Sequence, residues 1–160
     1  MTHRSTRDAQ AGISLIEVMV VLAIVGVMTG ATVVGIGALD RSGRAEAEAR
    51  RLVDRLQLAA DEALVAATPL ALTWDARGYR FFGWNREAGA WEAAVFPALG
   101  LPHALPATLR LEAETGADDA PVLIAPDLAT PAMQLRVMGG DRDWRVAFDG
   151  FASTAEAVER

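Results

Sequence analysis

The sequence predicts an α+β fold in which one long N-terminal helix packs on antiparallel β-sheet. Residues 13–39 are almost entirely apolar, and the residues after them repeat apolar side chains at the spacing of an amphipathic helix. After Pro69 the pattern changes to short alternating segments separated by Pro, Gly and Asp. The apolar stripe of the amphipathic helix is therefore expected to lie against the sheet.

The apolar run is long enough to cross a membrane. It has 27 residues, and Glu17 is its only charged residue. At about 1.5 Å rise per residue a helix of this length extends about 40 Å, whereas a bilayer core requires about 20 residues. Residues 13–39 are therefore predicted to form a transmembrane segment, which leaves about 120 residues for one soluble domain.

The twelve residues before this run have the wrong order for an ordinary secretory signal, in which the cleavage site follows the apolar stretch. Here the polar segment MTHRSTRDAQAG ends in small residues that precede the apolar run. This order resembles the leader of type IV prepilins. The residues that carry the resemblance are Gly12, Ile13, Ser14, Leu15, Ile16, Glu17 and Val18, where Ile13 replaces the phenylalanine usual in that family.

The resemblance implies that an inner-membrane prepilin peptidase cuts after Gly12 and methylates the new N-terminus of Ile13. The ammonium of Ile13 would then lie one helical turn from Glu17, on the same face. In filaments of this family the glutamate pairs with the N-terminus of a neighbouring subunit, which offsets the cost of a charge in the membrane. A simple membrane anchor with Glu17 in the headgroup zone is the alternative.

Two further features of the run bear on packing and topology. Gly26 and Gly30 form a G-x-x-x-G pair, which allows close helix packing in a bilayer. Arg4 and Arg7 favour a cytoplasmic N-terminus, but basic residues also follow the run, at Arg41, Arg44, Arg50 and Arg51. Charge alone does not choose the orientation, and the family resemblance implies that the N-terminus is cytoplasmic.

The amphipathic helix is predicted to end at Pro69. Its apolar stripe is expected to contain Leu52, Val53, Leu56, Ala59, Ala60, Ala63 and Leu64. Beyond it, LALTWD and YRFFGWN flank ARG and predict a β-hairpin in which Gly78 supplies a positive φ. The other predicted strands are AWEAAVF, TLRLEAE, PVLIA, MQLRVMG and WRVAFDG, with PALGLPHALPA as an irregular crossing.

The leader, the long helix, the hairpin and the late stretch PVLIAPDLATPAMQLRV together resemble the H-type minor pseudopilins of type II secretion, which are related to FimT-like and FimU-like minor pilins. Leu128 stands where that pattern usually has glycine after the proline-aspartate pair. The resemblance implies a leader at residues 1–12, the transmembrane helix at 13–39 and a periplasmic pilin-like domain at 40–160.

The residues give little support for an enzyme. His3 lies in the predicted leader and His103 stands alone among prolines, so no Ser-His-Asp order or metal-binding histidine cluster is available. The chain lacks cysteine, which excludes thiolate metal sites. Three aspartates lack the spacing of a calcium loop and are interpreted as turn residues, namely Asp141, Asp143 and Asp149. We expect no catalytic residue, metal or cofactor.

Nucleic acid is not an expected partner, because the net charge is -6. The hairpin aromatics Trp74, Tyr79, Phe81, Phe82 and Trp84 could stack on bases from one basic face, but few basic residues are near, and core positions or cross-strand pairs are expected for most of them.

The resemblance implies a structural subunit near the tip of a type II secretion pseudopilus, single-pass in the inner membrane, which assists export of folded proteins. Its implied partners are the other major and minor pseudopilins, the prepilin peptidase, the inner membrane and secreted protein substrates. The alternatives are a FimU-like minor pilin of a type IV pilus and a DNA-binding FimT-like competence pilin.

Overall fold

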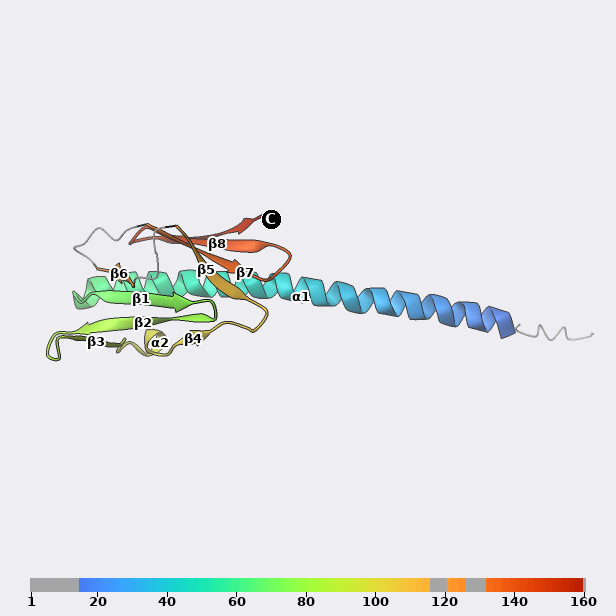
Figure 1. The fold of residues 1–160 in the computed structure, drawn as a ribbon, viewed down its shortest axis with the longest axis horizontal. Coiled ribbons are helices and arrows are strands. Elements are labelled where there is room, and N and C mark those ends of the chain that lie inside the picture. Colours follow the sequence, from blue (N-terminus) through green and yellow to red (C-terminus); the bar gives the residue numbers. More distant parts are fainter. Residues whose placement is uncertain (1–14, 116–120, 126–131, 160) are drawn as a thin grey trace, which may run out of the picture. The chain divides into compact units, whose positions relative to one another are not determined.

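The computed structural model describes residues 15–115, 121–125 and 132–159, with only the backbone for residues 28–42 and 115. The chain divides into two compact units, Met1–Gly37 and Ala38–Arg160. The described residues form one long helix, one short helix and nine strands (Figure 1). The predicted fold class is confirmed, because a helix packs on antiparallel sheets in the second unit.

Helix α1 runs over Leu15–Ala66, so the apolar run and the amphipathic stretch belong to one helix. It ends where Ala67 adopts a φ of 47°. The N–H of Ala67 donates to the Leu64 carbonyl at 3.4 Å, and the N–H of Thr68 donates to the Ala63 carbonyl at 3.2 Å. This pair of bonds is a Schellman motif, which satisfies two of the last helical carbonyls. The predicted end before Pro69 is confirmed.

One stripe of α1 is buried in the second unit. Its members are no more than 1% exposed and recur at alternating spacings of four and three residues: Ala45, Ala49, Leu52, Leu56, Ala59 and Ala63. Val53 and Ala60 of the predicted stripe are partly buried beside it. Leu64 is 64% exposed, so its assignment to the stripe was wrong. At 3.6 residues per turn Leu64 points about 100° away from Ala63, and it lies in the last turn.

The first sheet has the strand order β3-β2-β1-β6, and β4 also pairs with β2. All of these pairings are antiparallel. The short helix α2 (Pro97–Gly100) and β4 occupy the proline-rich segment that was expected to be irregular. The strands are β1 (Leu70–Asp75), β2 (Gly78–Asn85), β3 (Ala90–Ala93), β4 (His103–Ala104) and β6 (Val122–Ile124).

The β1–β2 hairpin is confirmed, but the reason given for its glycine was wrong. Gly78 is not among the glycines with positive φ, which are Gly89, Gly139 and Gly150 in the described chain. A Cβ at Gly78 would instead lie 2.2 Å from the backbone oxygen of His103. Glycine is required there because β4 approaches the backbone closely. The turn itself is stabilised by Asp75, whose Oδ1 accepts from the N–H of Arg77 at 2.6 Å.

The second sheet is antiparallel and has the strand order β5-β7-β8-β9. The strand β9 was not among the strands that the sequence predicted. Leu128, which stands where the family pattern usually has glycine, lies outside the described residues. The strands are β5 (Arg110–Thr115), β7 (Met133–Met138), β8 (Asp143–Phe148) and β9 (Ser153–Val158).

The core lies where the two sheets meet the second half of α1. Figure 1 shows β1 and β2 on one side of this part of the helix and β7 and β8 on the other side. The same buried cluster contains the helix stripe, Leu72 and Phe81 from the first sheet, and Leu135 and Val146 from the second. Full burial of each leucine, valine or phenylalanine side chain in this cluster stabilises the fold by about 1.5–3 kcal/mol.

Candidate assembly site

The predicted processing residues Gly12 and Ile13 lie outside the described residues, so cleavage and methylation there stay predictions. Glu17 lies in the first turn of α1 and is exposed. Gly26 also lies on α1, and a Cβ added there would have no atom within 4 Å. Gly30 belongs to the same helix. The open backbone at Gly26 suits close approach of another helix, and the packing role of this pair stays a prediction.

Apart from Glu17, the described side chains of the first unit are apolar around the whole helix. Ten large apolar side chains are between 46% and 81% exposed: Leu15, Ile16, Val18, Met19, Val20, Val21, Leu22, Ile24, Val25 and Val27. A helix that is apolar on all sides belongs in lipid or among other helices, because such a surface is unfavourable in water.

None of the helices, as far as the chain is described, has both the length and the apolarity needed to cross a membrane. The predicted transmembrane segment at residues 13–39 includes two residues before the described chain and a stretch with backbone only. That segment stays a prediction.

Glu17 has no possible counter-charge in the described part of its own unit. Residues 15–37 contain no basic residue and no histidine. A cation for this carboxylate must therefore come from outside this stretch, from the N-terminus or from another chain. In an apolar environment an unpaired carboxylate costs several kcal/mol, so a membrane location of the first unit would require such a cation.

His103 belongs to a polar cluster of the second unit and does not stand alone, as the sequence had suggested. Its Nε2 lies 2.6 Å from Oε2 of Glu48. The Nη1 of Arg51 donates to Oε1 of the same carboxylate at 3.0 Å. The His103 and Glu48 side chains are only 17% and 10% exposed. His103 belongs to β4, where it lies opposite Tyr79 of β2, and Glu48 belongs to α1. The contact between His103 and Glu48 therefore fixes β4 against α1.

Arg55 holds the α2 segment to α1. Its Nη2 donates to the carbonyls of Ala98 and Leu101 at 2.8 and 2.9 Å. The guanidinium also lies 5.2 Å from the centre of the Tyr79 ring. Burial raises the pKa of the Tyr79 hydroxyl above its usual 10.0, and the charge of Arg55 partly opposes this shift. These contacts join elements of the fold and do not form a nucleophile with an adjacent base.

The aromatic residues of the hairpin confirm the expectation of core positions and cross-strand pairs. Tyr79 and Phe81 are buried in the core, and their rings meet edge to face. Trp84 lies opposite Trp91 of β3, with ring centres 5.4 Å apart. Such a pair stabilises a sheet by about 0.5–1.5 kcal/mol beyond its buried area.

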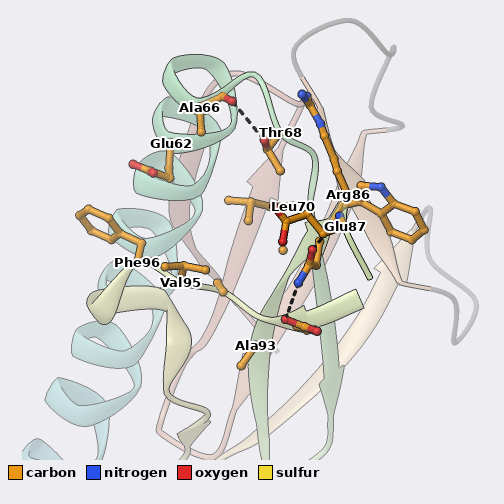
Figure 2. A pocket seen from close by; sticks show the side chains of 14 residues that line it. Glu62, Ala66, Thr68, Leu70, Arg86, Glu87, Ala93, Val95 and Phe96 are labelled. Atoms are coloured by element: carbon orange, nitrogen blue, oxygen red, sulfur yellow. Dashed lines mark hydrogen bonds between the residues drawn. The ribbon is translucent and has the colours of Figure 1, made fainter. Parts of the chain in front are cut away.

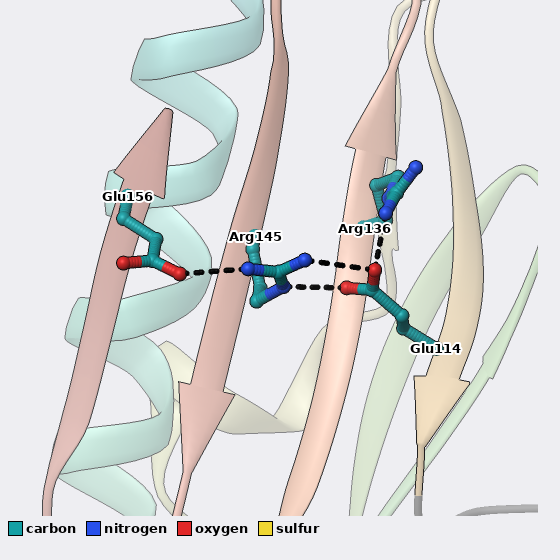
Figure 3. Close-up of polar contacts among 4 residues, drawn as sticks. All are labelled: Glu114, Arg136, Arg145 and Glu156. Carbon is teal, nitrogen blue, oxygen red and sulfur yellow. Dashed lines mark hydrogen bonds and ion pairs between the residues drawn. The ribbon is translucent and has the colours of Figure 1, made fainter. Parts of the chain in front are cut away.

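A charged row crosses the second sheet, with one residue from each strand (Figure 3). Arg136 and Arg145 lie directly opposite each other on β7 and β8, which is unfavourable for like charges. Glu114 accepts from both guanidiniums, with its Oε2 2.6 Å from Nε of Arg145. Arg145 also donates to Glu156 at 2.9 Å. Arg145 and Arg136 lower the pKa of Glu114 to about 2.

Of the three aspartates considered for calcium, Asp149 is a turn residue as expected. Its Oδ1 accepts from the N–H groups of Ala152 at 2.7 Å and Phe151 at 2.9 Å, and these bonds lower the pKa of Asp149. Asp143 is buried at the start of β8. Among the described residues no group of three or more His, Cys, Asp and Glu side chains could hold a metal ion.

Comparison with known proteins gives three findings. Residues 7–33 match the family model of the prokaryotic N-terminal methylation motif. Over 106 residues the chain is 28% identical to the type II secretion system protein H of Pseudomonas aeruginosa, and this match covers 66% of the chain and 62% of that protein. The chain thus spans less than two thirds of this relative.

The fold is similar to two solved structures of the minor pseudopilin EpsH from the type 2 secretion system of Vibrio cholerae. The TM-scores are 0.60 and 0.57 at 19% and 16% sequence identity. The superpositions cover 72% and 73% of this chain and 97% of each EpsH chain. The motif, the relative and the fold agree, and they confirm the resemblance to the H-type minor pseudopilins that the sequence had indicated.

Proposed function

We propose that this chain is a minor pseudopilin, a structural subunit at or near the tip of a type II secretion pseudopilus. The observation that carries the proposal is the first turn of α1, where Glu17 is the single charge of the apolar run 13–39 and lies within the residues that match the methylation motif. The relative named type II secretion system protein H and the EpsH-like fold support the same role. The subunit works by assembly and has no catalytic chemistry of its own.

Maturation creates the cation that Glu17 lacks. A prepilin peptidase cuts after Gly12 and methylates Ile13, which leaves an ammonium four residues before Glu17. Positions four residues apart share a helix face. The ammonium and the carboxylate are each costly in a low-dielectric medium and tolerable as a pair.

Assembly uses this pair between subunits. Glu17 of one chain pairs with the N-terminus of a neighbouring major or minor pseudopilin, while both helices are still in the inner membrane. The apolar surfaces then pack together, with Gly26 and Gly30 allowing close approach. The carboxylate fixes the axial register of the two helices, because only one alignment brings the charges together.

The proposed topology is a single pass through the inner membrane with a cytoplasmic N-terminus. The second unit, Ala38–Arg160, lies in the periplasm, where the pseudopilus assembles. In this position it assists export of folded proteins across the outer membrane, and secreted substrates are possible direct partners.

Replacement of Glu17 by valine tests the proposal. The more apolar helix partitions into the membrane at least as well, so E17V should be inserted and cleaved normally. We expect crosslinking of E17V to its co-expressed pseudopilins, and secretion, to fall at least about tenfold, which corresponds to a loss of about 1.4 kcal/mol. In vivo crosslinking and a secretion assay measure the two effects.

Asp54→Val is the matched control, because Asp54 is an exposed carboxylate on the second half of α1. D54V should be cleaved, crosslinked and secretion-competent. A cleaved and stable E17V protein with undiminished crosslinking and secretion would show that Glu17 is only a tolerated charge of a membrane anchor.

A further inference from the structure

A cavity of about 440 Å³ opens between the end of α1 and the β2–β3 hairpin (Figure 2). Its volume lies in the range of pockets that bind small ligands or peptide side chains. Leu70 and Ala94 contribute buried apolar surface. Val95 and Phe96 line the cavity as well, and Val95 is 97% exposed. An apolar side chain exposed to this degree beside a cavity marks a surface that a partner can cover.

The charged groups of the cavity are mainly acidic. Glu62, Glu87 and Glu92 line it, and none of them forms an ion pair with a described residue. Glu92 accepts one hydrogen bond from the Asn85 amide at 3.0 Å. Carboxylates elsewhere in the unit, such as Glu48, do have cationic partners.

The single basic residue among the lining groups does not neutralise these carboxylates. Arg86 donates through Nη2 to the carbonyl of Ala67 at 2.5 Å. Arg86 forms no ion pair of its own with a described carboxylate. The cavity therefore combines an apolar wall with three carboxylates that form no ion pair with a described residue.

This combination selects among classes of occupant. An anion would meet three like charges, and a purely apolar group would remove water from the carboxylates without replacing it. A lysine or arginine side chain meets both requirements, since its aliphatic stem covers apolar surface while its charged end reaches a carboxylate.

We propose that this cavity is a docking site for a lysine or arginine side chain that a partner protein presents within an apolar segment. The inference rests on the lining of the cavity and stands whether or not the chain works in secretion.

Three peptides of equal length test the proposal: acetyl-Leu-Lys-Leu-amide, acetyl-Leu-Gln-Leu-amide and acetyl-Leu-Glu-Leu-amide. The full chain is prepared in lipid nanodiscs with 5-fluorotryptophan, whose fluorine NMR signals report on each tryptophan. Trp84 lines the cavity, whereas Trp144 lies on β8 in the other sheet and is the internal reference. We expect a saturable shift of the Trp84 signal with the lysine peptide. Affinity should be at least about tenfold weaker for the other two peptides.

Glu62→Gln with Glu92→Gln should remove most of the preference for the lysine peptide. The matched control is Glu112→Gln with Glu159→Gln, which removes two carboxylates outside the cavity and should leave the preference intact. An unchanged Trp144 signal shows that each variant is folded. Equal binding of the lysine and glutamate peptides, no saturable shift at Trp84, or equal shifts at Trp84 and Trp144 would each overturn the proposal.

Discussion

The two described halves of helix α1 differ in how their apolar side chains are covered and in how their charged side chains are paired. In residues 43–66 one stripe is buried by the chain's own sheets, and the charged side chains Glu48 and Arg55 bind groups of the same unit. In residues 15–27 the apolar side chains are exposed, and residues 15–37 contain no basic residue that could pair with Glu17. The second half of α1 is therefore covered by the chain's own sheets, whereas the described side chains of the first half are not.

The comparison shows that one helix can carry two surfaces, one buried by its own sheets and one exposed. The large apolar burial of the second half keeps its folding independent of whether the first half has found partners.

Preventing cleavage should have the largest effect, because in the proposed maturation cleavage creates the ammonium that pairs with Glu17. Gly12→Leu should leave the leader attached, since a bulky side chain does not fit the peptidase site that accepts glycine. N-terminal sequencing should begin at Ile13 in wild type and at Met1 in G12L. Gly26→Leu is the control and should be cleaved normally, because a side chain there meets no neighbour within 4 Å. Wild-type protein that starts at Met1 despite an active prepilin peptidase would contradict the assignment.

A pair of leucine truncations compares the two halves directly. Leu56→Ala should lower the free energy of unfolding of the second unit by about 2–5 kcal/mol, because Leu56 is fully buried. Leu22→Ala should change it by less than about 0.5 kcal/mol, because Leu22 is exposed. Urea unfolding followed by tryptophan fluorescence measures the free energy of unfolding of the second unit in both variants, since all four tryptophans lie in that unit. A similar loss in both variants would show that the halves are not energetically separate.

Acid should weaken the charged row of the second sheet. The pKa of Glu114 is lowered from 4.5 to about 2 in the folded chain, so its stabilising effect is fully present above pH 4.5. That effect is lost as pH falls toward 2, because the unfolded chain takes up the proton first. Between pH 4.5 and 2 the melting temperature of wild type should fall more steeply than that of Glu114→Gln. Glu112→Gln, an exposed change on the same strand, should keep the wild-type slope; equal slopes in all three proteins would refute this role.

The smallest effect is expected at the end of α1. Ala67 has a φ of 47°, a conformation that glycine adopts with less strain. Ala67→Gly should raise the free energy of unfolding by about 0.5–1 kcal/mol. Ala66→Gly, one position earlier and still helical, should lower it by a similar amount. Chemical denaturation of both variants measures the contrast, and a destabilised A67G would argue against strain at this cap.

The elements in which apolar side chains recur with a regular period were predictable from the sequence. The helix stripe and the hairpin residues repeat apolar side chains at spacings that only one kind of secondary structure satisfies. β9 lacks this signal, because Ala155 is its core-facing apolar residue and the strand is otherwise rich in small and polar side chains. Its place in the sheet is set by pairing with β8, which a local pattern does not contain.

The polar contacts of the site were less predictable for a related reason. Glu48 and His103 are 55 positions apart in the chain, so no spacing rule links them. Gly78 was recognised as a necessary glycine, but the need arises from β4, which is distant in sequence. Glu17 was accessible to sequence reasoning because a single charge in an apolar run is visible without any tertiary information.

The position of β9 after the other three strands of its sheet has a consequence for the order of events during synthesis. The hydroxyl of Ser153 in β9 donates to the carbonyl of Val53 in α1 at 3.0 Å, across 100 positions of sequence. A growing chain can complete α1 and the first hairpin early, but its second sheet lacks the outer strand β9 until the residues up to Val158 have been made. A chain interrupted before β9 leaves β8 as an open edge, which invites aggregation. Completion of the second sheet thus waits for the last of its four strands to be synthesised.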